Sequence, residues 1–124
     1  MQPPRSVGEV LISNSMTVYI AGKITGQQID FCKNKFLTVE SLFREHGLKP
    51  INPFKLGCPD SWTFKQCKPF NFKAIRQCSA IFMLADYIDS PGSLDELAYA
   101  KKIHIPIYYQ SANDFYQLLE DSKT

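Results

Sequence analysis

Apolar residues recur with two different periods along the chain, and these periods predict strands that alternate with helices. Residues 17–21 are β-branched and aromatic, as in a strand, and the uninterrupted apolar run 79–85 is typical of a central parallel strand covered on both faces. Shorter strands are expected at 48–51 and 103–109. Pro106 lacks an N–H, so the last strand is expected at an edge of the sheet.

Between these strands, apolar residues at helical spacing predict helices. The first begins near Asp30 and ends at Gly47, since glycine suits the left-handed position after a last turn. Pro69 is expected to divide the next segment, because proline suits a first turn better than a helix interior. The later helices are expected at 62–68, 69–77, 93–102 and 113–119.

Strands that alternate with helices imply a parallel sheet with right-handed crossovers. We therefore expect one α/β domain over residues 16–124, preceded by an extension over residues 1–15. Its architecture should be three-layer α/β/α, with a four- or five-stranded parallel sheet of flavodoxin or Rossmann-like order. Ligands bind such folds at the carboxyl ends of the strands.

Composition narrows the class of protein. The chain has 124 residues, 44% hydrophobic and 21% charged, which is typical of a globular domain. A net charge of +2 does not favour nucleic-acid binding, and no apolar run approaches the ~20 residues of a membrane span. The first 15 residues do not resemble a secretion signal, so a cytoplasmic location is expected.

The four cysteines lack the spacing of a metal site. None forms C-x-x-C, and both histidines are distant in sequence, so no metal and no cofactor are expected. In a cytoplasmic protein we expect reduced thiols that serve mostly as buried packing residues. The four are Cys32, Cys58, Cys67 and Cys78.

The segment Ser90–Ala100 carries the clearest chemical signal. It follows the central strand and opens a helix, whose unpaired amides and partial positive charge attract anions. Ser93 and Glu96 also match the S-x-x-E capping box, which would make both residues structural. The pattern alone leaves the ligand-binding and capping interpretations open.

Other candidates lie near the same edge of the expected sheet. The loop Gly22–Gly26, which contains Lys23 and Ile24, follows the first strand. Tyr19 suits either a core position or a ligand contact, and Trp62 either stacks on a base or packs in the core. Asp86, just after the central strand, is either a ligand contact or an ordinary loop residue.

Three segments together resemble the nucleoside 2-deoxyribosyltransferase-like superfamily, most closely its small phage and bacterial members. They are VYIAGKITG at 18–26, FREHGLKPINP at 43–53 and CSAIFMLADYIDSPGSLDELAYA at 78–100. The resemblance covers residues 16 to about 109, with the segments in the family's order. It implies a small-molecule nucleoside or nucleotide as partner and a homo-oligomer, with neither nucleic acid nor a membrane involved.

The resemblance also implies roles for individual residues. The family's glutamate, which attacks C1′ of the sugar or stabilises the cation formed there, matches Glu96. Ser90 and Gly92 match the loop that holds the sugar or its 5′-phosphate, and Tyr19 and Gly22 match the family's first strand and loop. A carboxylate near C1′ stabilises an oxocarbenium-like state, and a helix start is expected to keep that carboxylate ionised.

Two departures from the family pattern bear on activity. An aspartate that helps to position or protonate the departing base is replaced by Asn71, which hydrogen-bonds a base but delivers no proton at neutral pH. Lys23 replaces a usual proline and either meets a phosphate or stays solvated. Asn71, Trp62 and Tyr19 are expected to orient the base.

Two functions from different classes follow. The leading one is N-glycosidic bond cleavage or deoxyribosyl transfer, with Glu96 as the nucleophile. The alternative is a catalytically weakened module that binds a nucleotide or ADP-ribose-like ligand as a sensor, sponge or regulator. A protein-interaction role on a degenerate enzyme fold is a third possibility. Glu96 favours an enzyme and Asn71 favours a binding module.

Overall fold

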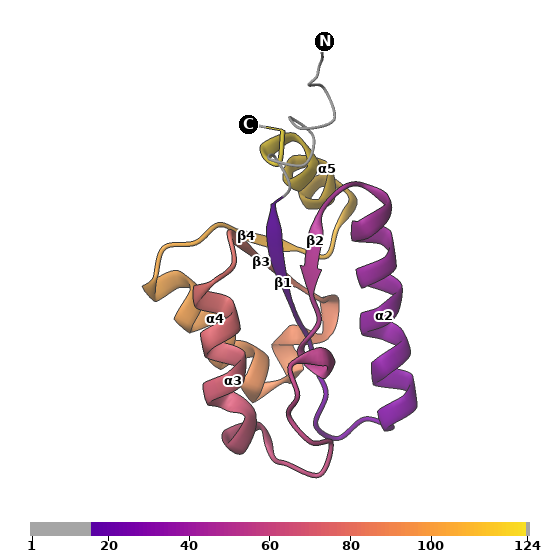
Figure 1. The fold of residues 1–124 in the computed structure, drawn as a ribbon, viewed down its shortest axis with the longest axis vertical. Coiled ribbons are helices and arrows are strands. Elements are labelled where there is room, and N and C mark those ends of the chain that lie inside the picture. The colour runs from indigo at the N-terminus through magenta and orange to yellow at the C-terminus, as the bar shows by residue number, and fades with distance from the viewer. Residues whose placement is uncertain (1–15, 124) are drawn as a thin grey trace.

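A computed structural model describes residues 16–123, so the extension over residues 1–15 lies outside the described residues. The described chain forms a four-stranded parallel sheet with helices on both faces (Figure 1). The sheet order is β2-β1-β3-β4, which is the flavodoxin-like order expected from the sequence. The strands are β1 (Thr17–Ala21), β2 (Lys49–Ile51), β3 (Ala80–Met83) and β4 (Ile107–Tyr109).

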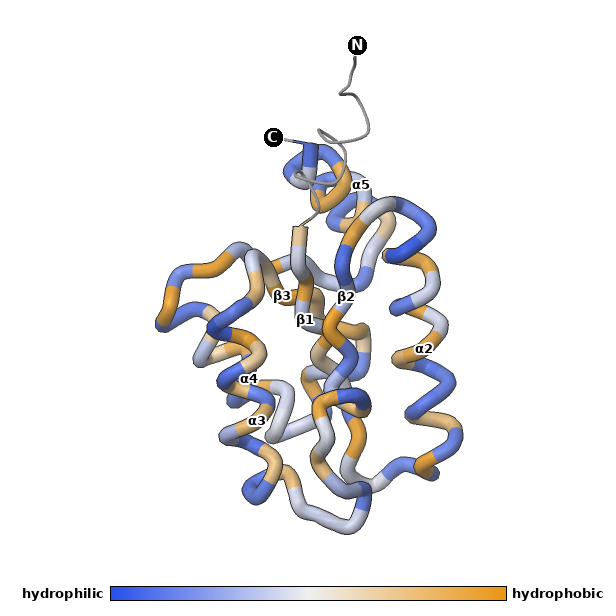
Figure 2. The backbone as a smooth tube through the Cα atoms, viewed as in Figure 1, coloured by the Kyte–Doolittle hydropathy of each residue, from blue (hydrophilic) through white to orange (hydrophobic). Residues whose placement is uncertain are grey.

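Alternation along β1 divides the core into two layers. Val18 and Ile20 pack beneath α2 (Ile29–Glu45) and α5 (Ala112–Asp121), whereas Tyr19 and Ala21 face α3 (Phe64–Arg76) and α4 (Pro91–Lys102). Hydropathy follows this division, since α2 alternates between hydrophobic and hydrophilic residues along its length (Figure 2). Both faces of β3 are buried, as its continuous apolar run predicts.

The helix α3 is longer than the sequence indicates. The chain between β2 and β3 forms one helix, with Pro69 inside it, instead of the two short helices expected. Thr63 caps this helix through a capping box with Gln66, and Ile75 buries its side chain against the sheet. Capping and packing therefore outweigh the ~3 kcal/mol that an interior proline costs.

The helix α4 begins earlier than expected, and its cap differs. Its N-cap is Ser90, whose Oγ accepts a hydrogen bond from the amide of Ser93 at 3.1 Å. Pro91 occupies the first helical position, where its missing N–H costs nothing. The capping box that Ser93 and Glu96 could have formed is absent, because Ser90 is the N-cap and the carboxylate of Glu96 is hydrogen-bonded to Tyr19.

The expectation of four reduced thiols is wrong for two of them. Cys58 and Cys67 form a disulfide with 5.9 Å between their Cα atoms, while Cys32 and Cys78 are free and buried as expected. The linkage joins the loop after β2 to the first turn of α3. Sequence spacing carries no signal for it, because the two residues become neighbours only when the loop folds back onto α3.

Candidate functional site

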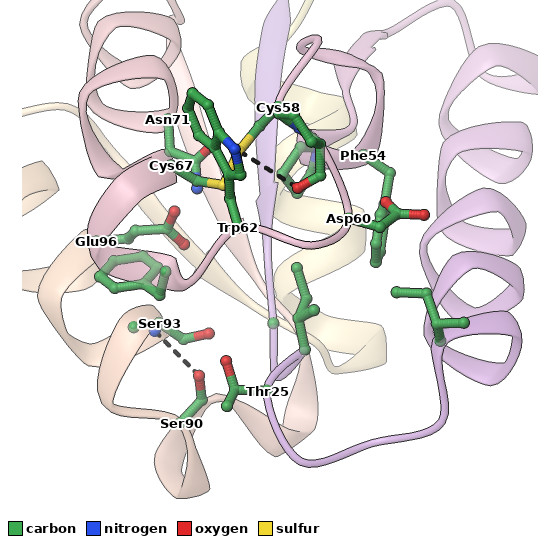
Figure 3. Close-up of a pocket in the computed structure, with 17 residues that line it drawn as sticks. Thr25, Phe54, Cys58, Asp60, Trp62, Cys67, Asn71, Ser90, Ser93 and Glu96 are labelled. Carbon is green, nitrogen blue, oxygen red and sulfur yellow. Dashed lines mark hydrogen bonds between the residues drawn. A yellow bond between two sulfur atoms is a disulfide. The ribbon is translucent and has the colours of Figure 1, made fainter.

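A cavity opens at the carboxyl ends of β1, β2 and β3, where the loops after these strands meet the first turns of α3 and α4 (Figure 3). Eight of the residues singled out from the sequence line this cavity. They are Gly22, Ile24, Trp62, Asn71, Ser90, Gly92, Ser93 and Glu96. The sheet brings them together because parallel strands end at one edge.

Glu96 is the buried carboxylate of the cavity. Its exposed fraction is 4%, and its Oε2 accepts a hydrogen bond of 2.8 Å from the hydroxyl of Tyr19. The side chain of Asn71 on α3 also lies beside the carboxylate and lowers its pKa. Tyr19 comes from β1 and is itself wholly buried, so three elements hold this one carboxylate. Tyr19 is thus a core residue whose hydroxyl also contacts Glu96 at the cavity.

The surroundings of Glu96 change the expectation that a helix start keeps it ionised. Burial raises the pKa of this carboxyl to about 7, and the side chains of Tyr19 and Asn71 offset only part of that rise. Burial and the adjacent Glu96 also raise the pKa of Tyr19 well above its usual value. The phenol therefore stays protonated and donates a hydrogen bond to the carboxylate. Near neutral pH, Glu96 is therefore present in comparable amounts as the acid and the carboxylate.

The first turn of α4 forms the floor of the cavity. Gly92 packs so closely against Phe64 of α3 that a Cβ atom at position 92 would lie 2.7 Å from the ring. Any side chain there would displace the ring, which itself lines the cavity. Ser93, one turn before Glu96, has an exposed fraction of 2% and directs its hydroxyl toward the cavity (Figure 3).

The loop after β2 lies across the cavity from α4, and sequence analysis missed most of it. Trp62 is 41% exposed, tilts against Phe70 and lines the cavity, which leaves its ring open to a ligand. The disulfide holds this loop to α3 (Figure 3). Thr25 lies in the candidate loop Gly22–Gly26, and the missed lining residues are Ile29, Pro53, Phe54, Cys58, Pro59, Asp60, Phe64 and Cys67. For those within residues 53–60 the one signal was position, since this segment follows the carboxyl end of an expected strand.

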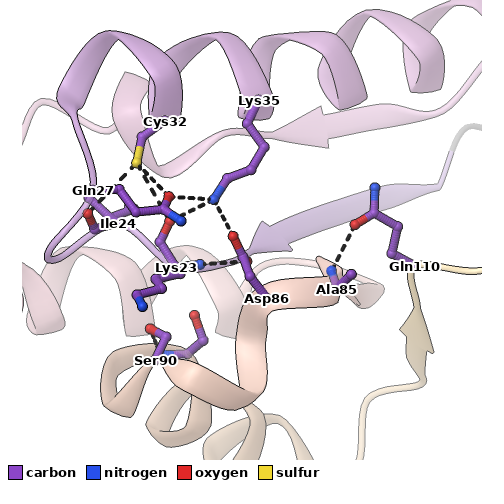
Figure 4. Close-up of polar contacts among 10 residues, drawn as sticks. Lys23, Ile24, Gln27, Cys32, Lys35, Ala85, Asp86, Ser90 and Gln110 are labelled. Atoms are coloured by element: carbon purple, nitrogen blue, oxygen red, sulfur yellow. Dashed lines mark hydrogen bonds and ion pairs between the residues drawn. The ribbon is translucent and has the colours of Figure 1, made fainter.

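Lys23 and Asp86 do not line the cavity. The Asp86 carboxylate accepts a hydrogen bond of 3.0 Å from the Lys23 amide and forms an ion pair with Lys35 of α2 (Figure 4). Burial would raise the pKa of Asp86, but the Lys23 amide and the Lys35 ammonium lower it overall. Lys35 also donates to the carbonyl of Lys23 at 2.8 Å. These contacts fix the loop after β1, and Asp86 therefore shapes the site from outside it.

The described residues contain no group of three histidine, cysteine, aspartate or glutamate side chains placed to hold a metal ion. Within residues 16–123, no helix is long and apolar enough to cross a membrane.

Two solved structures share this fold. A 2-desoxiribosyltransferase from Leishmania mexicana superposes with a TM-score of 0.58 and 22% identity over 76% of this chain, which spans 63% of the Leishmania chain. The CMP N-glycosidase of Clostridium botulinum superposes with a TM-score of 0.52 and 17% identity, over 86% of this chain and 81% of the other. No curated protein sequence matches the chain.

The chain therefore shares the nucleoside 2-deoxyribosyltransferase-like fold of these two proteins, the fold that the three sequence segments indicated. Within it, residues 16–109 match the family described as a domain of unknown function, DUF4406, and the chain belongs to that family. The matched segment holds the sheet and every residue that lines the cavity, and it ends before α5.

Proposed function

We propose that this chain cleaves the N-glycosidic bond of a nucleoside or nucleotide, with Glu96 as the nucleophile at C1′. The observation that carries the proposal is a buried carboxylate at the cavity wall whose polar neighbours, Tyr19 and Asn71, are both neutral. Once ionised, a carboxylate without a cation beside it is free to stabilise the positive charge that develops at C1′.

Each step of the reaction has a residue to support it. Ionised Glu96 attacks C1′ while the base departs with the electron pair of the glycosidic bond and takes a proton from water, and Tyr19 holds the carboxylate at its Oε2. Trp62 is placed to stack on the base, and the first turn of α4, at Ser90 and Gly92, receives the sugar or its phosphate. Water or a second base then attacks C1′ and releases Glu96, which gives hydrolysis or transfer.

Both structural relatives, a desoxiribosyltransferase and a CMP N-glycosidase, are named for this class of reaction, which supports the proposal. Their identity to this chain is low, so the reaction is argued from the chain's own cavity. The cytoplasmic location and the homo-oligomer implied by the resemblance stay predictions.

The second candidate is a binding module for a nucleotide or an ADP-ribose-like ligand. The specific observation in its favour is Asn71, which touches Glu96 but offers no proton to a departing base. Such a module would use the same cavity and hold the ligand intact.

One experiment separates the two candidates. The protein is incubated with the common nucleosides, deoxynucleosides and their 5′-monophosphates at pH 7.5, taken as roughly half a unit above the Glu96 pKa, and free base is measured by chromatography. Base release that Glu96→Gln abolishes and Glu120→Gln preserves supports the enzyme; Glu120 is an exposed glutamate on α5. Ligand binding without base release would overturn the proposal in favour of the module.

A further inference from the structure

Ser93 carries a hydroxyl that the fold does not use. Its Oγ is buried and, among the described residues, is the one buried side-chain polar atom without a hydrogen-bond partner. Capping of α4 does not involve this oxygen, because Ser90 supplies the cap and receives the Ser93 amide. The Ser93 side chain instead lines the cavity and points into it (Figure 3).

An unpaired buried hydroxyl destabilises a protein, because it loses its hydrogen bonds to water and gains none in return. Serine within a helix usually avoids this loss by bonding to the carbonyl four residues earlier. Ser93 makes no such bond. Alanine would fit the helix better at this position, so the hydroxyl is best explained by a group that enters the cavity.

The position of Ser93 relative to Glu96 identifies the kind of group. The two residues are three apart on α4, so they lie on one face of the helix with about 5–6 Å between their Cβ atoms. In a β-nucleoside, a nucleophile must approach C1′ from the face opposite the base. The hydroxyls at C2′ and C3′ project from that same face, toward the helix that carries Glu96.

We infer that Ser93 is a specificity-determining residue whose Oγ hydrogen-bonds a sugar hydroxyl, at C2′ or C3′, of a nucleoside or nucleotide attacked by Glu96. The inference rests on the proposed function and deepens it, since it names the part of the substrate that α4 recognises. A sugar that lacks both hydroxyls leaves Ser93 unpaired and binds more weakly.

Binding to the Glu96→Gln protein tests the inference without turnover. Cytidine, adenosine, guanosine and uridine 5′-monophosphates are titrated by calorimetry, and the tightest is compared with its 2′-deoxy, 3′-deoxy and 2′,3′-dideoxy forms. We expect the dideoxy form to bind at least fivefold more weakly, and the single-deoxy forms show which hydroxyl is responsible. In Glu96→Gln carrying Ser93→Ala, the four dissociation constants should agree within twofold.

Equal loss of affinity on removal of the hydroxyls in both proteins would overturn the inference, as would the absence of binding by all four monophosphates at millimolar concentration. Ser111→Ala in the same background is the matched control; Ser111 caps α5 and does not line the cavity. It should lower the melting temperature and keep the fivefold preference.

The unliganded Ser93→Ala protein should melt at or above the wild-type temperature, since it loses only an unpaired hydroxyl. A merely structural serine would show the reverse, so a lower melting temperature counts against the inference. Wild-type base release is measured in parallel. If base is released but the loss of affinity for the deoxy forms does not depend on Ser93, this inference alone is refuted. If that loss depends on Ser93 but no base is released, the proposed reaction alone is refuted.

Discussion

Two glutamates of this protein are buried to nearly the same degree and differ in what surrounds them. Glu40 on α2 is 3% exposed and Glu96 on α4 is 4% exposed. Glu40 accepts hydrogen bonds from Lys55 at 2.8 Å and Asn52 at 3.1 Å, and it pairs with Arg44 at 3.3 Å. Glu96 has only the neutral partners Tyr19 and Asn71.

The charged partners of Glu40 and the deeper position of Glu96 together shift the pKa values of the two carboxyls in opposite directions. Burial would raise the pKa of Glu40, but Lys55, Asn52 and Arg44 outweigh it and lower the pKa overall. Burial dominates at Glu96 and raises its pKa to about 7. A buried carboxylate surrounded by cations stays ionised and ties elements together, whereas one with neutral partners titrates near neutral pH, as a group used in chemistry does. Glu40 fixes the loop that begins at Asn52, and Glu96 faces the cavity.

The largest effect should come from removing the reactive carboxylate. Glu96→Gln should lower the rate of base release by about a thousandfold or more, because the amide cannot attack C1′. The rate is measured by chromatography of free base. Glu40→Gln, the same change at the other buried carboxyl, should retain measurable turnover; comparable losses in the two variants would remove the distinction between them.

The second effect is on stability and depends on pH. Because the pKa of Glu96 is raised in the folded protein, this carboxyl stabilises the fold fully below about pH 4.5, its pKa in the unfolded chain. The stabilisation is lost as the pH rises through about 7. Glu96→Gln should therefore gain about 3 kcal/mol in free energy of unfolding relative to the wild type between pH 4 and pH 8. Urea unfolding at both pH values measures this gain, and a constant difference would contradict it.

Glu40 should behave in the opposite way. Its lowered pKa means that its stabilising contribution is present above about 4.5 and is lost as the pH falls through the folded value. Glu40→Ala should cost about 2 kcal/mol at pH 7, through lost contacts with Asn52 and Lys55, and less at pH 3. Urea unfolding at pH 7 and pH 3 gives both values. A larger cost at the lower pH would show that the charge of Glu40 is not what stabilises the fold.

Asn71→Asp should make Glu96 part of a pair of carboxyls that share a site. Mutual repulsion raises the apparent pKa of the pair, and the new acid can protonate a departing base. We expect base release below pH 7 to rise by about tenfold and the pH profile to become bell-shaped, because the reaction then needs one ionised and one protonated carboxyl. Asn34→Asp, on the exposed face of α2, is the control. An unchanged pH profile would argue against contact between positions 71 and 96.

The smallest effect should follow Tyr19→Phe. Loss of the 2.8 Å hydrogen bond raises the pKa of Glu96 further, so the pH at half-maximal activity should rise by about one unit. Tyr116→Phe, on an exposed face of α5, should leave the profile unchanged. The two profiles are compared between pH 5 and pH 9, and a downward displacement for Tyr19→Phe would refute the role of the phenol as a donor.

The sequence predicted the fold because its main signals are local. The β-branched run of β1, the unbroken apolar run of β3 and the glycine that follows α2 specify elements without reference to distant residues. Parallel topology then brings the loops after β1 and β3 to one edge, so eight of the residues that line the cavity could be listed in advance. Pro69 led to the wrong prediction of two helices, because the destabilising effect of an interior proline is visible in the sequence. The packing of Ile75 that offsets this effect is not visible there.

What the tertiary structure decided is the environment of each side chain. The motif at Ser90–Ala100 allowed Glu96 either to cap its helix or to face a ligand, and the tertiary structure removed the first role by making Ser90 the cap and Tyr19 the hydrogen-bond partner of Glu96. The sequence likewise does not distinguish Glu40 from Glu96, or capping Ser90 from unpaired Ser93. Burial and partner charge come from residues far apart in the chain, and these quantities set a carboxyl's pKa and the stability cost of an unpaired hydroxyl.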